Sequence, residues 1–453
     1  MSARAQLAPR LERLRAAAAP LPPLRVSGSL TRVVGLTLEV RGCPLSVGDR
    51  CRVEGDRGEW VEAETVGFDG DRVYLMAVQD TGRLAPAARV QPVAAGGRVE
   101  VGEALLGRVI DSQGRPLDAG PAPLLPAQVP LVPAPRNPLD RALIDQPLDV
   151  GVRAINAVAT LGRGQRVGLF APSGVGKSTL LGMMTRNTEA DVVVVGLVGE
   201  RGREVSDFVH RVLGPAGLRK AVVIAAPADT PPLMRVHGAL RATAVAEYFR
   251  DRGRNVLLLM DSLTRFAQAL REVALAVGEP PATQGYTPSV FARLPQLIER
   301  AGTGSDGRGS ITAVYTVLTE DEDMGDPIAY AARAVLDGHI VLSRAIAESG
   351  RYPAVDVEPS ISRLMPDVVG AQHLQLARRF RAVSASYSAN RELISMGAYR
   401  RGSDPAVDEA IALQPKLETF LGQGVDSRVD LAQTLRELAQ LFAAAPGGRG
   451  EAA

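Results

Sequence analysis

Residues 171–178 read Ala171-Pro-Ser-Gly-Val-Gly-Lys177-Ser178. An apolar run of strand length, Arg166–Phe170, comes directly before them, and an apolar helical pattern begins at Lys177. Glycines in such a loop let backbone N–H groups close around phosphate oxygens, and the start of the helix offers its positive end to the same anion. The strict form of the pattern has glycine where this chain has Ala171. The stretch therefore predicts a phosphate-binding loop.

The loop predicts a role for each of its polar groups. We expect Lys177 to contact the β- and γ-phosphates of ATP and the Ser178 hydroxyl to bind Mg²⁺. The remaining nucleotide contacts are expected from neighbouring residues of the same stretch, namely Ser173, Gly174, Val175, Gly176 and Thr179.

Two carboxylates follow apolar runs that read as strands. Asp261 ends Asn-Val-Leu-Leu-Leu-Met-Asp, and Glu200 comes directly after Val192–Gly199. On a parallel sheet both would lie at the same carboxyl edge as the phosphate loop. We expect Asp261 to hold Mg²⁺ through water and Glu200 to orient and polarise the attacking water. The alternatives are a helix cap for Asp261 and a solvated charge cluster around Glu200.

Outward from the loop, strand-like and helix-like segments alternate from Leu148 onward. This alternation predicts an α/β fold with a parallel sheet covered on both faces. The expected strands are Arg166–Phe170, Val192–Gly199, Ala221–Ala226, Val256–Met260 and Ile311–Leu318, and the expected helices are Lys177–Thr185, Met234–Arg250 and Leu263–Val277.

The flanking regions have different patterns. Residues 1–23 read as a short amphipathic docking helix and linker, or as a frayed terminus, and residues 24–95 as a small antiparallel β-barrel. Its expected strands are Thr31–Val40, Asp49–Val53, Trp60–Phe68 and Arg72–Val78. The ATPase-like domain is placed at 96–370, with a proline-rich extended connector at 116–138. A helical domain at 371–442, clearest at Leu374–Tyr399 and Leu431–Phe442, and a disordered tail at 443–453 complete the prediction.

Composition limits the function classes. The 453 residues include 52 basic and 50 acidic side chains, and only 4% are aromatic. A near balance of charge with few aromatic rings argues against a nucleic-acid partner. Cys43 and Cys51 are expected to be reduced and packed, and no histidine or cysteine spacing predicts a zinc site. Neither a signal peptide nor a membrane-spanning run is recognisable, so we expect a soluble, cytoplasmic protein.

The stretch Gly302-Thr-Gly304-Ser-Asp-Gly307 has the spelling of a dinucleotide-binding fingerprint. It follows a helical pattern and precedes a strand, which is the reverse of the order that the fingerprint requires. We interpret it as a flexible loop.

Two further stretches carry a resemblance to a known family over nearly the whole chain. Residues 353–363, Pro-Ala-Val-Asp-Val-Glu-Pro-Ser-Ile-Ser-Arg, resemble the signature shared by F-type, V-type and type III secretion ATPases, which form RecA-like hexameric rings. Gly199-Glu200-Arg201 is similar to the catalytic glutamate motif of the F-type β subunit. The resemblance implies that Arg363 is an arginine finger reaching the neighbouring subunit's site. It also implies that Tyr352 stacks on adenine and that Arg201 lies near the γ-phosphate.

Within the family, Pro232-Leu-Met-Arg235 and Gly285-Tyr-Thr-Pro-Ser-Val-Phe291 resemble the flagellar type III export ATPases more than the injectisome branch. This implies an ATP hydrolase that helps deliver export substrates to a membrane gate. The implied partners are further copies of the chain, a stator-like regulator at the N-terminus, a central stalk protein, export chaperones with their substrates, and gate proteins. The implied location is the cytoplasm, at the inner membrane's export apparatus. An injectisome ATPase, an RNA-translocating hexamer, an ATP synthase subunit and a non-hydrolysing nucleotide-binding scaffold remain alternatives.

Overall fold

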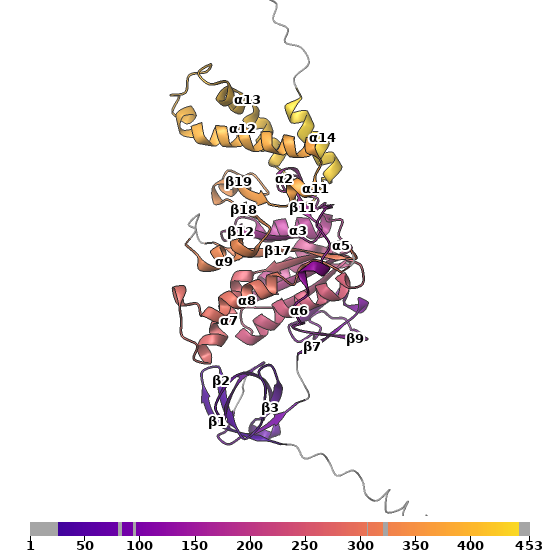
Figure 1. The fold of residues 1–453 in the computed structure, drawn as a ribbon, viewed down its shortest axis with the longest axis vertical. Helices are drawn as coiled ribbons and strands as arrows, with labels where there is room; N and C mark the ends of the chain where they lie inside the picture. Colours follow the sequence, from indigo (N-terminus) through magenta and orange to yellow (C-terminus); the bar gives the residue numbers. More distant parts are fainter. Residues whose placement is uncertain (1–25, 80–83, 94–96, 306, 320–324, 444–453) are drawn as a thin grey trace, which may run out of the picture. The chain divides into compact units, whose positions relative to one another are not determined.

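The computed structural model describes residues 26–79, 84–93, 97–305, 307–319 and 325–443. The chain divides into two compact units, Met1–Gly96 and Gly97–Ala453 (Figure 1). The expected docking segment at 1–23 and residues 444–453 of the expected tail lie outside the described residues. No helix in the described ranges is both long enough and apolar enough to cross a bilayer.

The first unit is a closed antiparallel barrel with the strand order β1-β2-β5-β4-β3-β6, which confirms the predicted barrel. One expected strand was wrong, because Thr31–Val40 is divided between β1 and β2 by a hairpin turn at Gly35, where φ is +56°. Cys43 and Cys51 are free thiols in the buried interior. The six strands are β1 (Gly28–Val34), β2 (Thr37–Arg41), β3 (Arg50–Glu54), β4 (Trp60–Asp69), β5 (Arg72–Ala77) and β6 (Arg89–Pro92).

The second unit is built on a nine-stranded sheet in which the order β19-β18-β12-β17-β15-β13-β14-β8 runs from edge to edge, with β16 beside β17. The strands from β18 to β8 are parallel, which confirms the predicted parallel sheet, and β19 is antiparallel to β18. The strands are β8 (Val109–Asp111), β12 (Arg166–Ala171), β13 (Val192–Val198), β14 (Ala221–Ala226), β15 (Asn255–Asp261), β16 (Gly302–Thr303), β17 (Ser310–Leu318), β18 (Gly338–Leu342) and β19 (Val355–Ser362).

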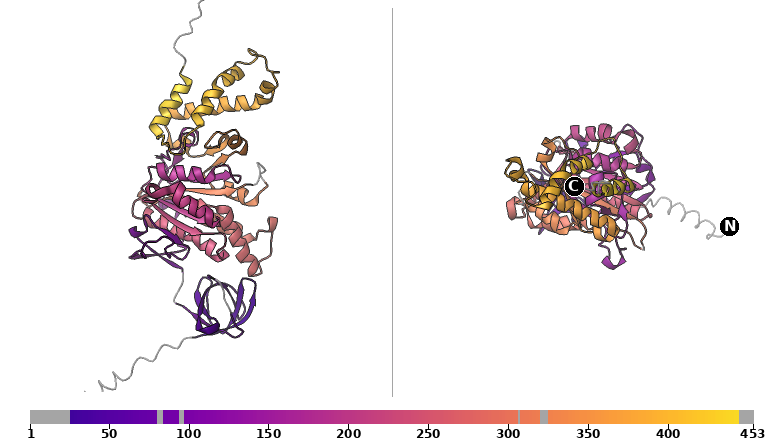
Figure 2. Two further views of the ribbon diagram at one scale, coloured as in Figure 1. Left: turned by 180° about the vertical axis from the view of Figure 1, so that it is seen from behind. Right: turned by 90° about the horizontal axis from the view of Figure 1, so that it is seen from above.

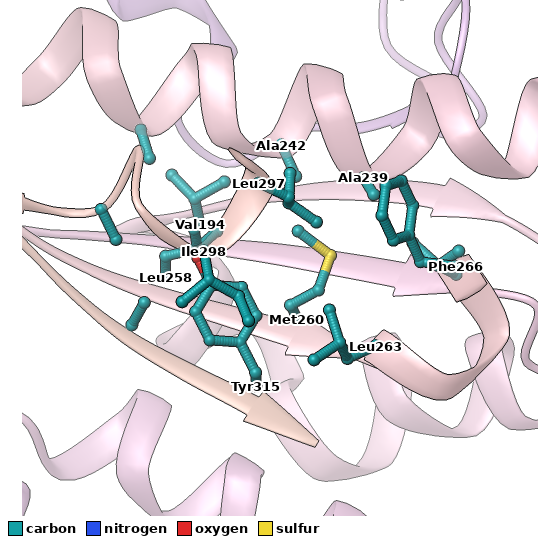
Figure 3. Close-up of a cluster of buried hydrophobic side chains, with 14 of the residues drawn as sticks. Val194, Ala239, Ala242, Leu258, Met260, Leu263, Phe266, Leu297, Ile298 and Tyr315 are labelled. Carbon is teal, nitrogen blue, oxygen red and sulfur yellow. The ribbon is translucent and has the colours of Figure 1, made fainter. Parts of the chain in front are cut away.

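Helices cover both faces of this sheet, as Figure 2 shows from a second side. Successive residues of a strand point to opposite faces, so Val194 packs in one core and Val193 in the other. The first core lies under α6 (Pro232–Arg250), α7 (Leu263–Ala276), α8 (Pro288–Ile298) and α9 (Pro327–Val335); Figure 3 shows Met260, Phe266 and Tyr315 within it. The second core lies under α2 (Arg153–Val158), α3 (Lys177–Asn187) and the π-helix Phe208–Leu213, and it extends to the C-terminal helices.

The C-terminal helices are α12 (Ala371–Ser395), α13 (Pro405–Leu421) and α14 (Leu431–Phe442). The predicted Leu374–Tyr399 helix ends earlier than expected, at Ser395, and α13 lies within the predicted helical domain, although its own bounds were not predicted. Aspartates cap the last two helices, since Asp404 accepts from the Ala406 N–H and Asp430 from the Gln433 N–H. Shorter helices are α4 (Gly202–Asp207), α5 (Gly214–Leu218), α10 (Arg344–Glu348) and α11 (Met365–Val368).

The proline-rich connector packs on the second unit through a two-stranded sheet of β7 (Arg98–Val101) and β9 (Ala127–Pro130). A further pair joins β10 (Pro147–Leu148) to β11 (Leu161–Gly162). The stretch at 302–307 is not wholly a flexible loop, because Gly302 and Thr303 pair with β17 as β16. The helix-before-strand order that argued against a dinucleotide site is present.

Candidate active site

The phosphate loop joins β12 to α3 at the carboxyl edge of the sheet. Gly174 and Gly176 adopt left-handed φ angles of +83° and +91°, which glycine reaches without strain. Gly176 is also the N-cap of α3, and no side chain caps that helix. The unpaired N–H groups at the start of an uncapped helix are ready donors to an anion. The loop therefore has the backbone geometry that phosphate binding needs.

Lys177 contacts two carboxylates at the carboxyl end of the parallel strands. Its Nζ lies 2.5 Å from Asp261 Oδ1 and 3.2 Å from Glu200 Oε1. The three side chains come from the start of α3, the end of β15 and the loop after β13, and Leu197 of β13 pairs in register with Asp261. All three are largely buried, with side-chain exposures of 11% for Lys177, 15% for Glu200 and 3% for Asp261. The parallel register brings together groups 84 positions apart in sequence.

Burial shifts the protonation of this cluster. Burial alone lowers the pKa of Lys177, but the charges of Asp261 and Glu200 outweigh it and leave that pKa raised. Burial, the charge of Asp261 and a hydrogen bond with Glu204 raise the pKa of Glu200 to about 7, against the opposing effect of Lys177. A carboxylate with a pKa near neutrality is suited to accept a proton at physiological pH.

The residues at this edge fit a magnesium ion bound together with phosphates. Ser178 lies exposed in the first turn of α3, and Asp261 offers a carboxylate at the end of β15. Hydroxyl and carboxylate oxygens are ligands that Mg²⁺ prefers, and it is commonly held by one or two protein groups plus substrate phosphates. Among the described residues no group of three or more histidine, cysteine or acidic side chains could hold a metal ion by itself.

Tyr352 and Arg201 lie at the same edge as the phosphate loop. A Cβ placed on Gly176 would be 3.4 Å from Tyr352 Cε1, so the ring lies beside the loop of its own chain, and it is 45% exposed. The Gln423 N–H donates to the Tyr352 carbonyl and ties this residue to the chain after α13. Arg201 is 80% exposed and pairs with Glu204 at 3.6 Å. Both side chains are therefore open to a ligand above the loop.

Arg363 lies at the amino end of the parallel strands, opposite the carboxyl end that carries the phosphate loop. Its N–H donates to the Asp337 carbonyl, the Asp337 N–H donates to the Arg166 carbonyl, and Arg166 begins β12. The length of β12 separates this level from the phosphate loop, a distance of about 17 Å at 3.3 Å per residue. The exposed guanidinium donates to the Arg333 carbonyl at 3.4 Å. Arg363 therefore cannot reach the phosphate loop of its own chain.

Sequence reasoning missed two residues that support the site. Thr316, on β17, donates its hydroxyl to Asp261 Oδ1 at 2.7 Å and so fixes the carboxylate. Gln423 holds the Tyr352 backbone. The signal for Thr316 was a polar residue within the apolar run of β17, whereas Gln423 has no signal in sequence because its partner lies 71 positions away.

Comparisons with known proteins agree with this geometry. Residues 151–362 match the model of the ATP synthase alpha/beta family, nucleotide-binding domain, and residues 369–440 match the T3SS EscN ATPase C-terminal domain. The chain is 56% identical to the flagellum-specific ATP synthase of Pseudomonas aeruginosa over 94% of each chain, and 55% identical to that of Salmonella typhimurium over 95% of this chain and 97% of the relative. The structure of the assembled ATPase EscN from enteropathogenic E. coli superposes with a TM-score of 0.86 at 41% identity, covering 91% of this chain and 99% of that one.

Proposed function

The chain belongs to the ATP synthase alpha/beta family, and on that premise we propose that it is the ATP hydrolase of a flagellar type III protein export apparatus. The observation that carries the proposal is the contact of Lys177 with both Asp261 and Glu200 at the end of the phosphate loop. A nucleotide-binding scaffold needs the lysine and the loop, but it has no need of a buried glutamate with a pKa of about 7.

The residues divide the reaction between them. The backbone of residues 173–179 and the Lys177 ammonium bind the β- and γ-phosphates, while Ser178 and Asp261 would hold Mg²⁺. The bound ion would neutralise charge that develops on the phosphates. Glu200 orients a water for in-line attack on the γ-phosphorus and draws its proton as the bond to the β-phosphate oxygen breaks. The products are ADP and inorganic phosphate.

Lys177 changes partner during this cycle. Its ammonium contacts Asp261 and Glu200. Phosphate oxygens of an arriving nucleotide compete for the same ammonium, which frees Glu200 to accept a hydrogen bond from water. Loss of the Lys177 contact also raises the proton affinity of Glu200, because the lysine is what opposes the raised pKa.

A complete site requires a second copy of the chain. Developing charge on the transferred phosphoryl group needs a donor beyond the loop, and Arg363 is too far from its own loop to supply it. In a closed ring each protomer would insert Arg363 into its neighbour's site. The similarity to the assembled ATPase EscN supports a ring, and we propose a hexamer.

A stalk partner is supported by a second EscN structure. A structure of EscN in complex with its central stalk EscO superposes with a TM-score of 0.84 at 41% identity, so we propose an equivalent stalk partner for this chain. An N-terminal regulator, export chaperones with their substrates, and membrane gate proteins complete the proposal, with the ring at the cytoplasmic side of the inner membrane. No nucleic-acid partner is proposed.

The test combines turnover with motility. ATP hydrolysis is measured against protein concentration for the wild type and for Glu200→Gln, whose amide is close in shape but cannot accept the proton. We expect a cooperative rise in the wild type and none in the variant. The wild-type chain and its Glu200→Gln variant are each expressed in a Salmonella typhimurium strain that lacks its own flagellum-specific relative. Only the wild-type chain should restore swimming. Hydrolysis without rescue of swimming would favour an injectisome ATPase, and absence of hydrolysis in the wild type would contradict the proposal.

A further inference from the structure

Two leucines project into solvent from the connector that precedes β10. Leu139 is 91% exposed and Leu143 is 89% exposed. Scattered surface leucines are common, but two almost fully exposed side chains only four residues apart form an apolar patch that costs free energy in water. Within the described part of their own unit, no side chain covers either leucine.

The segment that carries them is firmly held. Arg141, between the two leucines, donates to the carbonyls of Ala301 at 2.9 Å and Glu299 at 2.5 Å. The Thr303 hydroxyl donates to the Ala142 carbonyl at 2.8 Å, and Asn137 accepts from the Leu139 N–H at 3.2 Å. The leucines are therefore presented on a fixed backbone, as the anchors of a preorganised interface are.

Leu139 and Leu143, the apolar patch, lie at the same end of the parallel strands as Arg363, the amino end. Thr303, which holds the segment, pairs with Ser310 at the amino end of β17. On the other side, Ile144 and Val368 both lie within 3.1 Å of the position that a Cβ on Gly162 would occupy, and Val368 ends the short helix that follows Arg363. The segment thus runs between the amino end of β17 and the chain just after Arg363.

A third exposed apolar side chain lies close to Arg363 in the chain. Ile361, near the end of β19 and two residues before Arg363, is 48% exposed. β19 is the last strand of its sheet in the described part of the chain. Arginine is enriched at protein interfaces, and Arg363 lies at the same end of the parallel strands as the exposed leucines.

We infer that Leu139 and Leu143 form the surface by which one copy of this chain docks on the next and so seats Arg363 in the neighbour's phosphate site. The inference rests on the proposed function and names the contact that makes the shared site. A second copy is the occupant because Arg363, at the same edge, has no phosphate loop of its own within reach. The two leucines pack against the copy that receives Arg363, and they position that arginine without contacting the nucleotide.

The test uses the full chain and a matched control. Leu139→Asp/Leu143→Asp places two charges in the patch, and Leu124→Asp places one charge at an equally exposed leucine, 89% exposed, in the connector before β9. Assembly is followed by sedimentation with Mg²⁺ and a non-hydrolysable ATP analogue, and turnover is measured across protein concentration. Binding of a fluorescent ADP analogue by the dilute protein reports whether each variant has folded.

We expect the double variant to need at least about tenfold more protein than the wild type for half-maximal assembly and turnover. The reason is that burial of two leucine side chains no longer stabilises the contact between copies. Its ADP binding should match the wild type, and Leu124→Asp should behave as the wild type throughout. Equal assembly of the double variant and the wild type, or an equal shift in Leu124→Asp, overturns the inference. If the double variant loses ADP binding, Leu139→Ala/Leu143→Ala replaces it, and an unshifted assembly midpoint then overturns the inference. A wild type that assembles but never hydrolyses ATP would contradict the proposed function while leaving the docking surface tested by sedimentation.

Discussion

Replacing Lys177 by methionine should destabilise the protein as well as stop hydrolysis. Lys177 is the cation between Asp261 and Glu200, and all three side chains are at most 15% exposed. Methionine keeps the length of the side chain but leaves two buried carboxylates facing each other. Removing one partner of a buried ion pair costs about 3–5 kcal/mol. At about 2 °C per kcal/mol for a large unit, the lower figure predicts a fall in melting temperature of about 6 °C at pH 8.

The pH dependence separates this effect from a simple packing defect. Without the lysine, the folded-state pKa of Glu200 rises further above its unfolded value, so the folded variant binds more protons than the unfolded chain. Its stability relative to the wild type must therefore improve as the pH falls, because a proton then replaces the missing positive charge. We expect the difference in melting temperature to shrink markedly between pH 8 and pH 6.

The assay is calorimetric unfolding of nucleotide-free protein at both pH values, alongside ATP turnover. Lys177→Arg is the matched control: it keeps the charge and should unfold close to the wild type, yet it should hydrolyse poorly, because a planar guanidinium does not fit a site made for a compact ammonium. A Lys177→Met melting temperature equal to that of the wild type at pH 8, or a deficit of the same size at both pH values, would refute the reasoning.

Three further outcomes are expected from the same site. The wild-type kcat/KM for ATP, which reports the free enzyme, should fall as the pH drops below about 7, where Glu200 becomes protonated, and Glu200→Gln should lose at least about a hundredfold in kcat/KM at pH 8; a flat wild-type kcat/KM from pH 6 to 8 would contradict this. Mixing inactive Glu200→Gln with inactive Arg363→Ala should restore part of the turnover, since some interfaces pair an intact glutamate with an intact arginine; mixtures that form rings but stay inactive would argue against a shared site. Tyr352→Ala should raise the KM for ATP about tenfold through lost stacking, with kcat little changed, whereas Tyr352→Phe should keep both; equal defects in the two variants would mean that the hydroxyl and not the ring is needed.

Most of the central sheet could be predicted because its strands are buried on both faces. Runs such as Val192–Val198 and Asn255–Asp261 are almost uniformly apolar, and the predicted ends differ from the observed ones by one residue. The elements that were missed are short or lie at edges. β8 and β18 have three and five residues, too few for a period to be recognised, and β18 lies next to the edge strand β19. The hairpin at Gly35 was missed because its flanking strands are both rich in β-branched residues and read as one.

The chemistry of the site was largely readable because each group sits next to a strong local pattern. Lys177 follows a glycine-rich loop, and Glu200 and Asp261 follow buried strands. The carboxyl ends of parallel strands meet at one edge, so a correct fold class was enough to place the three residues together. Their role in hydrolysis stays a prediction until the variants above are measured. Thr316 was not found, because its hydrogen bond to Asp261 depends on strand order.

The phosphate loop, the candidate reacting groups and the layered α/β fold could all be read from the residues, because loop glycines, helix starts and apolar periodicity are local properties of the chain. The end of the parallel strands at which each group lies depends on how distant strands pair, which is a property of the folded chain. Tyr352 and Arg363 are 11 positions apart, and both flank β19, yet the antiparallel pairing of β19 with β18 places the tyrosine beside its own phosphate loop and the arginine at the far edge. Strand direction and register are set by pairing between distant segments, and that pairing places Arg363 out of reach of the phosphate loop of its own chain.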